Sequence, residues 1–466
     1  MNKEGDKMVL INPSWRTKYP QPPLGLASLA AVLEKNEYQV EILDANALQL
    51  SENEIVKKVD SADIIGITAM TPTINSAIRI ARGIKQINPD STIILGGPHA
   101  TILPEDILNN VPEVDIIVRG EGEETIVELC NALENNNSIE NIHGISYRND
   151  GAIKNTPSRP QIMDLDTLPF LAYHLLPLDK YKLHPPHGRA YPFMAMLTSR
   201  GCPFKCIFCS KSVFGSTYRG QSPERIVDEI VYLKERFGIK EIAFYDDVLT
   251  LKQKRVMQLV KKLEERNLDI PWTCEARVNL VTEELLRAMK KAGCYMIAYG
   301  IESGNQMILN NLRKNITIEQ IKSATEATRK AGVQSVGYFM FGSPGETPET
   351  IRQTIDFARS LDIDFAQFSV TMPFPGTDLY DLYLDSGNKN TKWDDFIYAN
   401  LKSSSAPVFE TEALPKEDLQ AWNAKAYKEF YFRVSYIWKR FIGIRSIGDL
   451  KTNIKGFLMF FDMVRG

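Results

Sequence analysis

Residues 201–209 read GCPFKCIFC and place Cys202, Cys206 and Cys209 at C-x3-C-x2-C spacing. An apolar run at 193–197 lies just before this stretch and predicts a buried strand, so the cysteines would fall on the loop at its carboxyl end. Thiolates at such short intervals can surround one soft metal centre. The stretch therefore predicts a metal or cluster site at the end of a strand.

Two kinds of metal centre fit cysteines at this spacing. A structural zinc ion takes four ligands, so Cys274 or Cys294 would have to complete the site. An iron–sulfur cube held by three cysteines leaves one iron open, and an open iron can bind a substrate or a cofactor. A third alternative is that the cysteines stay reduced and hold nothing. The spacing favours the cluster, and Cys274 and Cys294 are expected to be buried apolar residues in or beside strands.

The composition excludes several classes of protein. The 466-residue chain is long enough for two or three domains, and its net charge of −3 argues against a dedicated nucleic-acid binder. The first residues contain no long apolar region, so no signal peptide is expected, and no apolar stretch approaches the roughly 20 residues of a membrane span. The cysteine pattern is not that of a secreted disulfide framework. We therefore expect a protein of the reducing cytoplasm.

Residues 1–148 alternate short apolar runs with amphipathic stretches. Strands that alternate with helices predict an α/β domain with a Rossmann-like, doubly wound parallel sheet. Such sheets bind ligands at the carboxyl ends of their strands, so the loops after the strands are the informative ones. The expected strands are 8–11, 40–43, 64–68, 92–95 and 116–118.

Glycines gather in these loops, at 96–97 and 120–122. Glycine lets the backbone approach a bulky flat ligand, although the same residues could simply form tight turns, and spacing alone leaves both open. No G-x-G-x-x-G follows the first strand, so a nicotinamide site is not expected. The informative loops are 12–25, 68–73, 96–101 and 119–124.

Three of these segments, 22–25 (PPLG), 95–99 (LGGPH) and 119–123 (RGEGE), resemble the cobalamin-binding domain of the cobalamin-dependent radical S-adenosylmethionine enzymes. Many corrinoid carriers have a D-x-H-x-x-G loop whose histidine coordinates cobalt, but residues 44–49 (DANALQ) lack both the histidine and the glycine. The resemblance therefore implies a cobalamin without a histidine ligand, or a degenerate domain that binds nothing. The cobalamin-binding residues that it implies are Pro23, Leu24, Gly25, Thr68, Thr71, Gly96, Gly97, Pro98, His99, Gly120, Glu121 and Gly122.

The alternation resumes over 191–385, after a polar, proline-rich range at 149–190 that is expected to be a linker. Six strand–helix units in succession predict an open, partial (β/α)6 barrel, whose chemistry would collect at the carboxyl ends of its strands. The expected strands are 193–198, 241–245, 272–276, 295–299, 335–341 and 365–371.

Polar motifs lie at the ends of the expected barrel strands, at 245–247 (YDD), 275–277 (EAR), 300–304 (GIESG) and 341–347 (FGSPGET). A structural protein has little reason to place carboxylates, an arginine and glycines at the same end of consecutive strands. Together with the cysteine loop, this order resembles the radical S-adenosylmethionine superfamily over most of the remaining chain.

That resemblance implies that Cys202, Cys206 and Cys209 hold a [4Fe–4S] cluster whose fourth iron is chelated by the methionine end of S-adenosylmethionine. Some of the residues implied for the cofactor have a structural alternative, as a core phenylalanine, an ion pair or a helix cap. The implied site consists of Phe208 against the adenine, Asp246 or Asp247 at the amine, Arg277 at the carboxylate, Glu302 and Ser303 at the ribose and methionine end, and Gly342 with Glu346 on the adenine side.

Residues 386–466 depart from the barrel pattern and predict a helical C-terminal domain. Aromatic residues are interleaved with lysines and arginines from Trp422 to Phe461. Such a segment can form a helical cap over the larger domains, or it can lie at a membrane interface. The cap is the favoured interpretation, and peripheral contact with an anionic membrane is the alternative.

The resemblance implies a radical enzyme that uses the cluster, S-adenosylmethionine and cobalamin to modify an unactivated carbon, with C-methylation favoured. The alternative within the same architecture is a radical cyclase or rearranging enzyme that acts on a lipid, isoprenoid or tetrapyrrole. A corrinoid-binding sensor is a remote third. The substrate would be a small or lipid-like molecule, and a reducing partner such as flavodoxin or ferredoxin would supply the electron.

Overall fold

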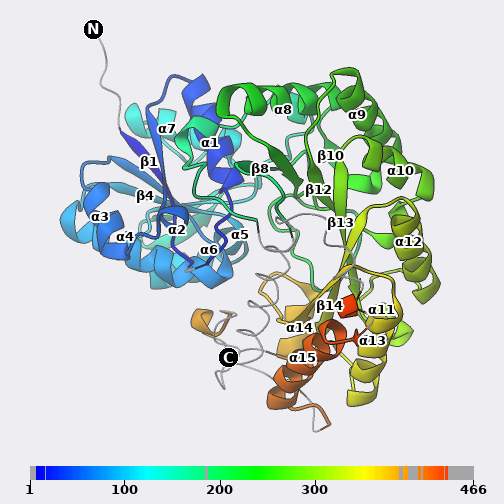
Figure 1. Cartoon of the computed structure of the whole chain (residues 1–466). Helices are drawn as coiled ribbons and strands as arrows, with labels where there is room; N and C mark the ends of the chain where they lie inside the picture. The colour runs from blue at the N-terminus through cyan, green and yellow to red at the C-terminus, as the bar shows by residue number, and fades with distance from the viewer. Residues whose placement is uncertain are drawn as a thin grey trace.

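The computed structural model describes residues 7–15, 17–183, 187–387, 392–396, 408–410, 413–434 and 436–438 (Figure 1). Two α/β units lie against one another, the first drawn in blue to cyan and the second in green to yellow. The orange-red helix α15 (Lys416–Tyr431) lies on the second unit. Our expectations for 439–466 lie outside the described residues.

Five parallel strands form the body of the first sheet, in the order β2-β1-β3-β4-β5. They confirm the expected parallel arrangement, and each strand end lies within one residue of its predicted position. The strands are β1 Met8–Asn12, β2 Val40–Asp44, β3 Ile64–Thr68, β4 Thr92–Gly96 and β5 Ile116–Val118.

An antiparallel hairpin, β6 (Ile145–Asn149) and β7 (Ala152–Asn155), extends this sheet beyond β5. The parallel pattern did not predict it, and β7 falls inside the range 149–190 that we expected to be a linker. Asp150 and Gly151 join the two strands with φ of 49° and 79°, the left-handed pair that a two-residue hairpin turn requires. The Asp-Gly dipeptide was the signal for this hairpin.

Alternate residues of the parallel strands face opposite layers of helices. Val9 and Ile11 of β1 pack in a core with α3, α4 and α6, whereas Met8 and Leu10 pack in a core with α1 and α7. Both faces of a parallel sheet are apolar, so both must be covered. The helices are α1 Leu24–Lys35, α2 Ala45–Leu48, α3 Glu52–Lys58, α4 Ile74–Ile87, α5 Pro98–Ile102, α6 Pro104–Asn110 and α7 Glu123–Glu134.

The second sheet contains six parallel strands in chain order, β8-β11-β12-β13-β14-β15, and helices follow each strand. This order confirms the expected succession of strand–helix units, and within the described residues no pairing joins β15 back to β8. β13 (Cys294–Glu302) runs further than expected, so Glu302 ends the strand instead of following it. The other strands are β8 Phe193–Met196, β11 Glu241–Phe244, β12 Trp272–Ala276, β14 Gln334–Phe341 and β15 Phe365–Val370; the helices are α8 Pro223–Phe237, α9 Gln253–Glu265, α10 Glu283–Lys291, α11 Gln306–Asn311, α12 Ile318–Lys330, α13 Pro348–Ser360 and α14 Asp378–Asp385.

Helix α15 lies along the open edge of β15. The Tyr427 hydroxyl donates to Phe368 O and accepts from Phe368 N, both over 3.1 Å, and Tyr431 does the same with Ala366 over 2.8 and 3.0 Å. The two hydroxyls therefore satisfy backbone groups of β15, which no further strand pairs within the part of the chain that the structure describes. For this part of the C-terminal region the structure shows a helix packed on the second unit, whereas we expected a cap over both larger domains. None of the helices described here is long and apolar enough to cross a membrane.

Candidate active site between the two sheets

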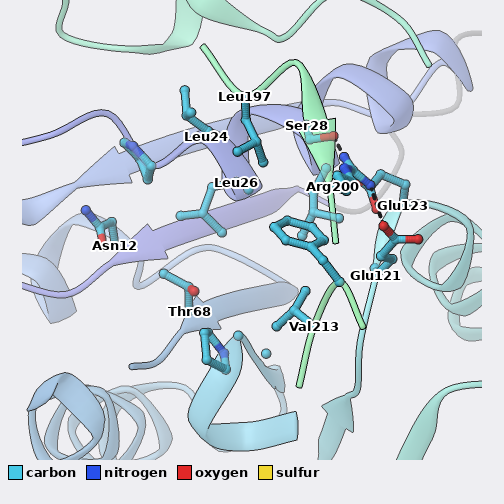
Figure 2. A pocket seen from close by; sticks show the side chains of 18 of the residues that line it. Asn12, Leu24, Leu26, Ser28, Thr68, Glu121, Glu123, Leu197, Arg200 and Val213 are labelled. Atoms are coloured by element: carbon cyan, nitrogen blue, oxygen red, sulfur yellow. Dashed lines mark hydrogen bonds and ion pairs between the residues drawn. The ribbon is translucent and has the colours of Figure 1, made fainter. Parts of the chain in front are cut away.

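A cavity of about 750 Å³ lies between the first sheet and the cysteine loop (Figure 2). Loops at the carboxyl ends of β1, β3, β4 and β5 form one wall, and residues after β8, including Cys202 and Cys209, form another. Figure 2 shows Leu197 and Val213 of the second unit facing the same space as Thr68 of the first. The cavity therefore joins the two cofactor sites that the sequence predicts.

Most of the predicted cobalamin-binding residues line this cavity. Gly25 and Gly120 expose their backbone to the cavity, because a Cβ built on either residue would meet no other atom within 4 Å. The shape therefore fits a large flat ligand, since bare backbone forms part of the wall. Those that line the cavity are Pro23, Leu24, Gly25, Thr68, Gly96, Gly97, Pro98, Gly120, Glu121 and Gly122.

Thr71 and His99, the other two predicted residues, are not among the residues that line the cavity. His99 is fully buried behind the loop, with Nδ1 3.1 Å from Thr71 Oγ1 and its ring edge-on to Trp393 at 5.2 Å. Burial lowers the pKa of His99 to about 4, so the ring is neutral at pH 7. Thr71 and His99 therefore pack beneath the loop after β4 and do not contact the cavity.

The loop that replaces D-x-H-x-x-G uses its aspartate for structure. Asp44 is fully buried and accepts hydrogen bonds from Asn12 Nδ2 at 2.8 Å and from the Tyr181 hydroxyl at 2.9 Å. Burial raises the pKa of the Asp44 carboxyl, and these hydrogen bonds oppose the increase. Asn12 and Asn46 reach the cavity, and no histidine lines it among the described residues. The donor set fits a cobalamin without a histidine ligand.

The cysteine loop carries its thiols to the edge of the cavity and just behind it. Cys206 is buried, and Arg277 Nη1 donates to its sulfur over 3.5 Å while the guanidinium lies over the Phe204 ring at 3.7 Å. The positive charge of Arg277 would stabilise the Cys206 thiolate when that thiolate binds a cluster iron. Arg277 therefore contacts a predicted cluster ligand, and its Nη2 also donates to Lys314 O.

Burial raises the pKa of two of the three thiols, those of Cys202 and Cys209. Cys209 is exposed to the cavity, yet the surrounding protein desolvates it and raises the pKa of its thiol to about 12, and burial also raises the pKa of Cys202. Within the described residues no three His, Cys, Asp or Glu side chains are placed to hold a single metal ion. A cube binds each thiolate through a different iron, so its ligands need not converge on one point. Cys274 and Cys294 are buried in β12 and β13, as expected, and among the described residues neither converges with the loop cysteines as a zinc site would require.

Asp246 and Asp247 follow β11 and have different surroundings. Asp246 is fully buried and accepts hydrogen bonds from Thr198 Oγ1 over 2.7 Å and from Ser199 Oγ. Burial raises the pKa of Asp246, and the nearby Arg255 opposes the increase. Asp247 lines the cavity beside Cys202. Of the two, Asp247 is the one placed to meet a ligand.

Glu302 forms a buried ion pair that sequence reasoning missed. Lys314 Nζ lies 2.7 Å from Glu302 Oε1, and both side chains are less than one-tenth exposed. Glu302 has a left-handed φ of 68°, and a Cβ on Gly300 would lie within 2.7 Å of both charged groups. Lys314 Nζ is also 5.6 Å from the centre of the Phe208 ring. The pair therefore lies next to the predicted adenine and methionine contacts.

Ser303, Gly342 and Glu346 lie within the protein framework around this region. Ser303 Oγ is 3.0 Å from Thr354 Oγ1 and is fully buried. Glu346 Oε2 accepts from Gly342 N over 2.6 Å and from Ser343 N over 3.0 Å. Burial raises the pKa of Glu346 to about 7. Gly342 has φ of 83° and faces Leu419 of α15.

A buried ion network connects the two units beside the cavity (Figure 2). Arg200, two residues before Cys202, donates to Glu123 over 2.6 Å and to Glu121 over 3.1 Å. Burial alone would raise the pKa of Glu123, but Arg200 reverses this and lowers it. Ser28 Oγ also donates to Glu123, over 2.7 Å. The sequence did not reveal this network, because its members become neighbours only when the units dock.

Comparison with known proteins places these features in a family. A model of the B12 binding domain matches residues 16–130, and a model of the Radical SAM superfamily matches residues 196–358. An uncharacterized methyltransferase of Pyrococcus horikoshii is 40% identical over 90% of this chain and 89% of its own length. The anaerobic magnesium-protoporphyrin IX monomethyl ester cyclase of Rubrivivax gelatinosus is 32% identical over 89% of this chain and 75% of its own.

The chain belongs to the cobalamin-dependent radical S-adenosylmethionine enzymes. A solved member, the cobalamin-dependent S-adenosylmethionine radical enzyme OxsB with aqua-cobalamin and S-adenosylmethionine bound, matches with a TM-score of 0.76, 18% identity and coverage of 99% of this chain and 72% of that one. The likeness confirms the fold. As a cobalamin-dependent radical S-adenosylmethionine enzyme, the chain uses cobalamin, a [4Fe–4S] cluster and S-adenosylmethionine, as the sequence predicted.

Proposed function

We propose that this enzyme transfers a methyl group to an unactivated carbon of a small molecule. The observation that carries the proposal is the shared cavity: the glycine loops of the first sheet and Cys202 and Cys209 of the second unit open into one space. The Pyrococcus horikoshii methyltransferase, similar over nine-tenths of this chain, supports the same reading. When bound, the cluster with S-adenosylmethionine supplies a carbon radical and the cobalamin carries the methyl group.

The chain's own residues would bind and orient the cluster and S-adenosylmethionine and enclose the space between them and the corrinoid. Cys202, Cys206 and Cys209 would hold the cluster, with Arg277 against the sulfur of Cys206. Asp247 would accept a hydrogen bond from the amine of S-adenosylmethionine. The remaining contacts that we assign to that cofactor are Phe208, Glu302 and Lys314, while Ser303, Gly342 and Asp246 hold the framework around it.

The apolar part of the cavity wall protects a reactive species from water. Leu24, Leu26 and Leu197 face the cavity, as Figure 2 shows, and their apolar side chains help to exclude water from it. The protein's contribution to catalysis is therefore positioning and exclusion of water, and the cofactors carry the chemistry.

The decisive experiment uses S-adenosylmethionine labelled with deuterium in its methyl group. The full chain, reconstituted anaerobically with iron, sulfide and cobalamin, would be incubated with reductant and a small-molecule extract of anaerobically grown cells. A product that gains one labelled methyl group, together with 5′-deoxyadenosine, supports the proposal. Turnover of a small molecule without any label would contradict it.

A radical cyclase is the second candidate, because a cyclase is 32% identical over most of this chain. It would form 5′-deoxyadenosine and change the substrate without adding a methyl group, so the same experiment separates the two. A corrinoid sensor would form no 5′-deoxyadenosine in this experiment.

We further propose that a reducing partner such as flavodoxin or ferredoxin supplies the electron and that the enzyme acts in the cytoplasm. Peripheral membrane contact would involve the aromatic and basic segment from Trp422 to Phe461, of which residues 439–461 lie outside the described range.

A further inference from the structure

Two arginines face one another at the base of the cysteine loop. Arg200 and Arg219 are partners across the antiparallel pair β9 (Ser199–Arg200) and β10 (Arg219–Gly220), which encloses residues 201–218. Like charges directly opposite on two strands repel, and both guanidiniums are at most 10% exposed. This arrangement requires negative charge from elsewhere in the chain.

The first unit supplies that charge from its glycine loop. Arg219 Nη1 lies 2.7 and 2.8 Å from the two oxygens of Glu121, and Arg200 binds Glu121 and Glu123. The side chains of both carboxylates are at most 6% exposed. The base of the cysteine loop is therefore neutral only while it is docked on the loop after β5.

Arg219 joins one wall of the cavity to the other without lining it. Its Nη2 donates to Phe214 O over 3.0 Å, and Nη1 also donates to Ile162 O over 2.8 Å. Glu121 and Phe214 line the cavity, whereas Arg219 is not among the lining residues. Arg219 thus contacts neither the space for the corrinoid nor a predicted cluster ligand.

We propose that Arg219 is a positioning residue that couples occupation of the corrinoid cavity to the conformation of the cysteine loop. The proposal rests on the proposed function, because it requires a corrinoid in the cavity. A corrinoid against the backbone of 120–122 fixes Glu121, which fixes Arg219, which in turn holds Phe214 and the base of the loop. The connection is a continuous chain of ion pairs and hydrogen bonds, and both sites can bias it.

The test compares the full chain with Arg219→Met and Arg219→Lys, each reconstituted with the cluster, and uses aquacobalamin as the probe. Hydrogen–deuterium exchange of 201–218 is measured with and without aquacobalamin, and binding is followed by visible absorption. Arg148→Met is the matched control, because Arg148 also donates to backbone carbonyls, those of Leu108, Val111 and Val114, within the first unit.

Aquacobalamin is expected to slow exchange of 201–218 about threefold or more in the parent chain and in Arg148→Met. Arg219→Met should still bind aquacobalamin but lose this slowing. Arg219→Lys keeps the charge without the planar fork, so its slowing should be intermediate.

Equal slowing in the parent and Arg219→Met, or no slowing in a parent that binds aquacobalamin, overturns the coupling and leaves the proposed function intact. A parent that binds no aquacobalamin overturns both. If thermal unfolding shows that Arg219→Met does not fold, Arg219→Lys decides, and slowing equal to that of the parent then overturns the coupling.

Discussion

Cys202 and Gly97 line the same cavity, although Cys202 follows β8 in the second sheet and Gly97 follows β4 in the first. Each lies at the carboxyl end of a parallel strand, where α/β sheets present their ligands. The two sheets therefore direct their ligand-binding ends into one space. The proposed function requires such a shared space, because the carried methyl group and the radical must reach the same substrate atom.

Gly97→Ala should weaken binding of cobalamin. Gly97 has φ of 93°, and an added Cβ would lie 2.9 and 3.0 Å from the backbone O and N of Ala69. The loop after β4 would have to move, at a cost of about 1–3 kcal/mol, which corresponds to binding weaker by roughly fivefold to 150-fold. Titration of the apoprotein with aquacobalamin, followed by absorption, measures this.

Gly151→Ala is the matched control for that variant. Gly151 also has a left-handed φ, of 79°, but a Cβ there would meet nothing within 4 Å and the turn between β6 and β7 does not line the cavity. Its affinity for cobalamin should equal that of the parent. Equal affinities in all three proteins would show that the loop after β4 is not part of the corrinoid site.

Lys314→Met should destabilise the fold and weaken binding of S-adenosylmethionine. It leaves the buried Glu302 carboxylate without its partner at 2.7 Å, at a cost of about 3–5 kcal/mol in the free energy of unfolding. Adding Glu302→Gln removes the unpaired charge and should recover part of the stability but not the affinity. Denaturant unfolding and equilibrium binding of S-adenosylmethionine measure the two effects.

Lys330→Met provides the comparison, because Lys330 pairs with Glu326 over 2.8 Å on an exposed surface. Exposed pairs contribute little, so neither the melting temperature nor the affinity should change. If Lys314→Met behaved like Lys330→Met in both measurements, the buried pair would have no part in the site.

Glu346 should make the stability of the enzyme depend on pH. Burial raises the pKa of its carboxyl from an ordinary 4.5 to about 7 in the folded state. A raised carboxyl pKa stabilises the fold below about pH 4.5, and that contribution is lost as pH rises through about 7. The shift corresponds to about 3–4 kcal/mol. Glu346→Gln should remove this part of the dependence, which denaturant unfolding at pH 5 to 8.5 measures; identical profiles would contradict the assignment.

Tyr431→Phe should loosen the edge of β15 locally. It removes a hydroxyl that bonds both backbone groups of Ala366, a loss of about 1–2 kcal/mol. Amide exchange at Ala366 should accelerate while that at Phe368, held by Tyr427, stays near the parent rate. Tyr427→Phe should show the reverse pattern. Uniform acceleration in both variants would mean that the tyrosines act only through packing.

The sequence revealed those parts of the enzyme that depend on local pattern. Alternating apolar runs predicted both parallel sheets, because period and spacing are local properties of a chain. The glycine loops and the cysteine spacing likewise identified the two sides of the cavity, since each is a short motif at the end of a strand.

Features that depend on distant partners were not predictable in this way. Asp246 and Asp247 are neighbours in the chain, yet Asp246 bonds Thr198 inside the protein and Asp247 lines the cavity. Successive side chains at a strand end point in opposite directions, and the sequence does not say which faces the ligand. Lys314 and Arg219 were missed because their partners come together only through folding and docking.

The most direct test of the two cofactor sites is the iron and cobalt content of the purified chain after anaerobic reconstitution. The parent and Cys130→Ala, which alters a buried cysteine of the first unit, should each hold about four irons and one cobalt. The triple variant of Cys202, Cys206 and Cys209 to alanine should lose the iron and keep the cobalt. Full iron in the triple variant, or no cobalt in the parent, would contradict the account.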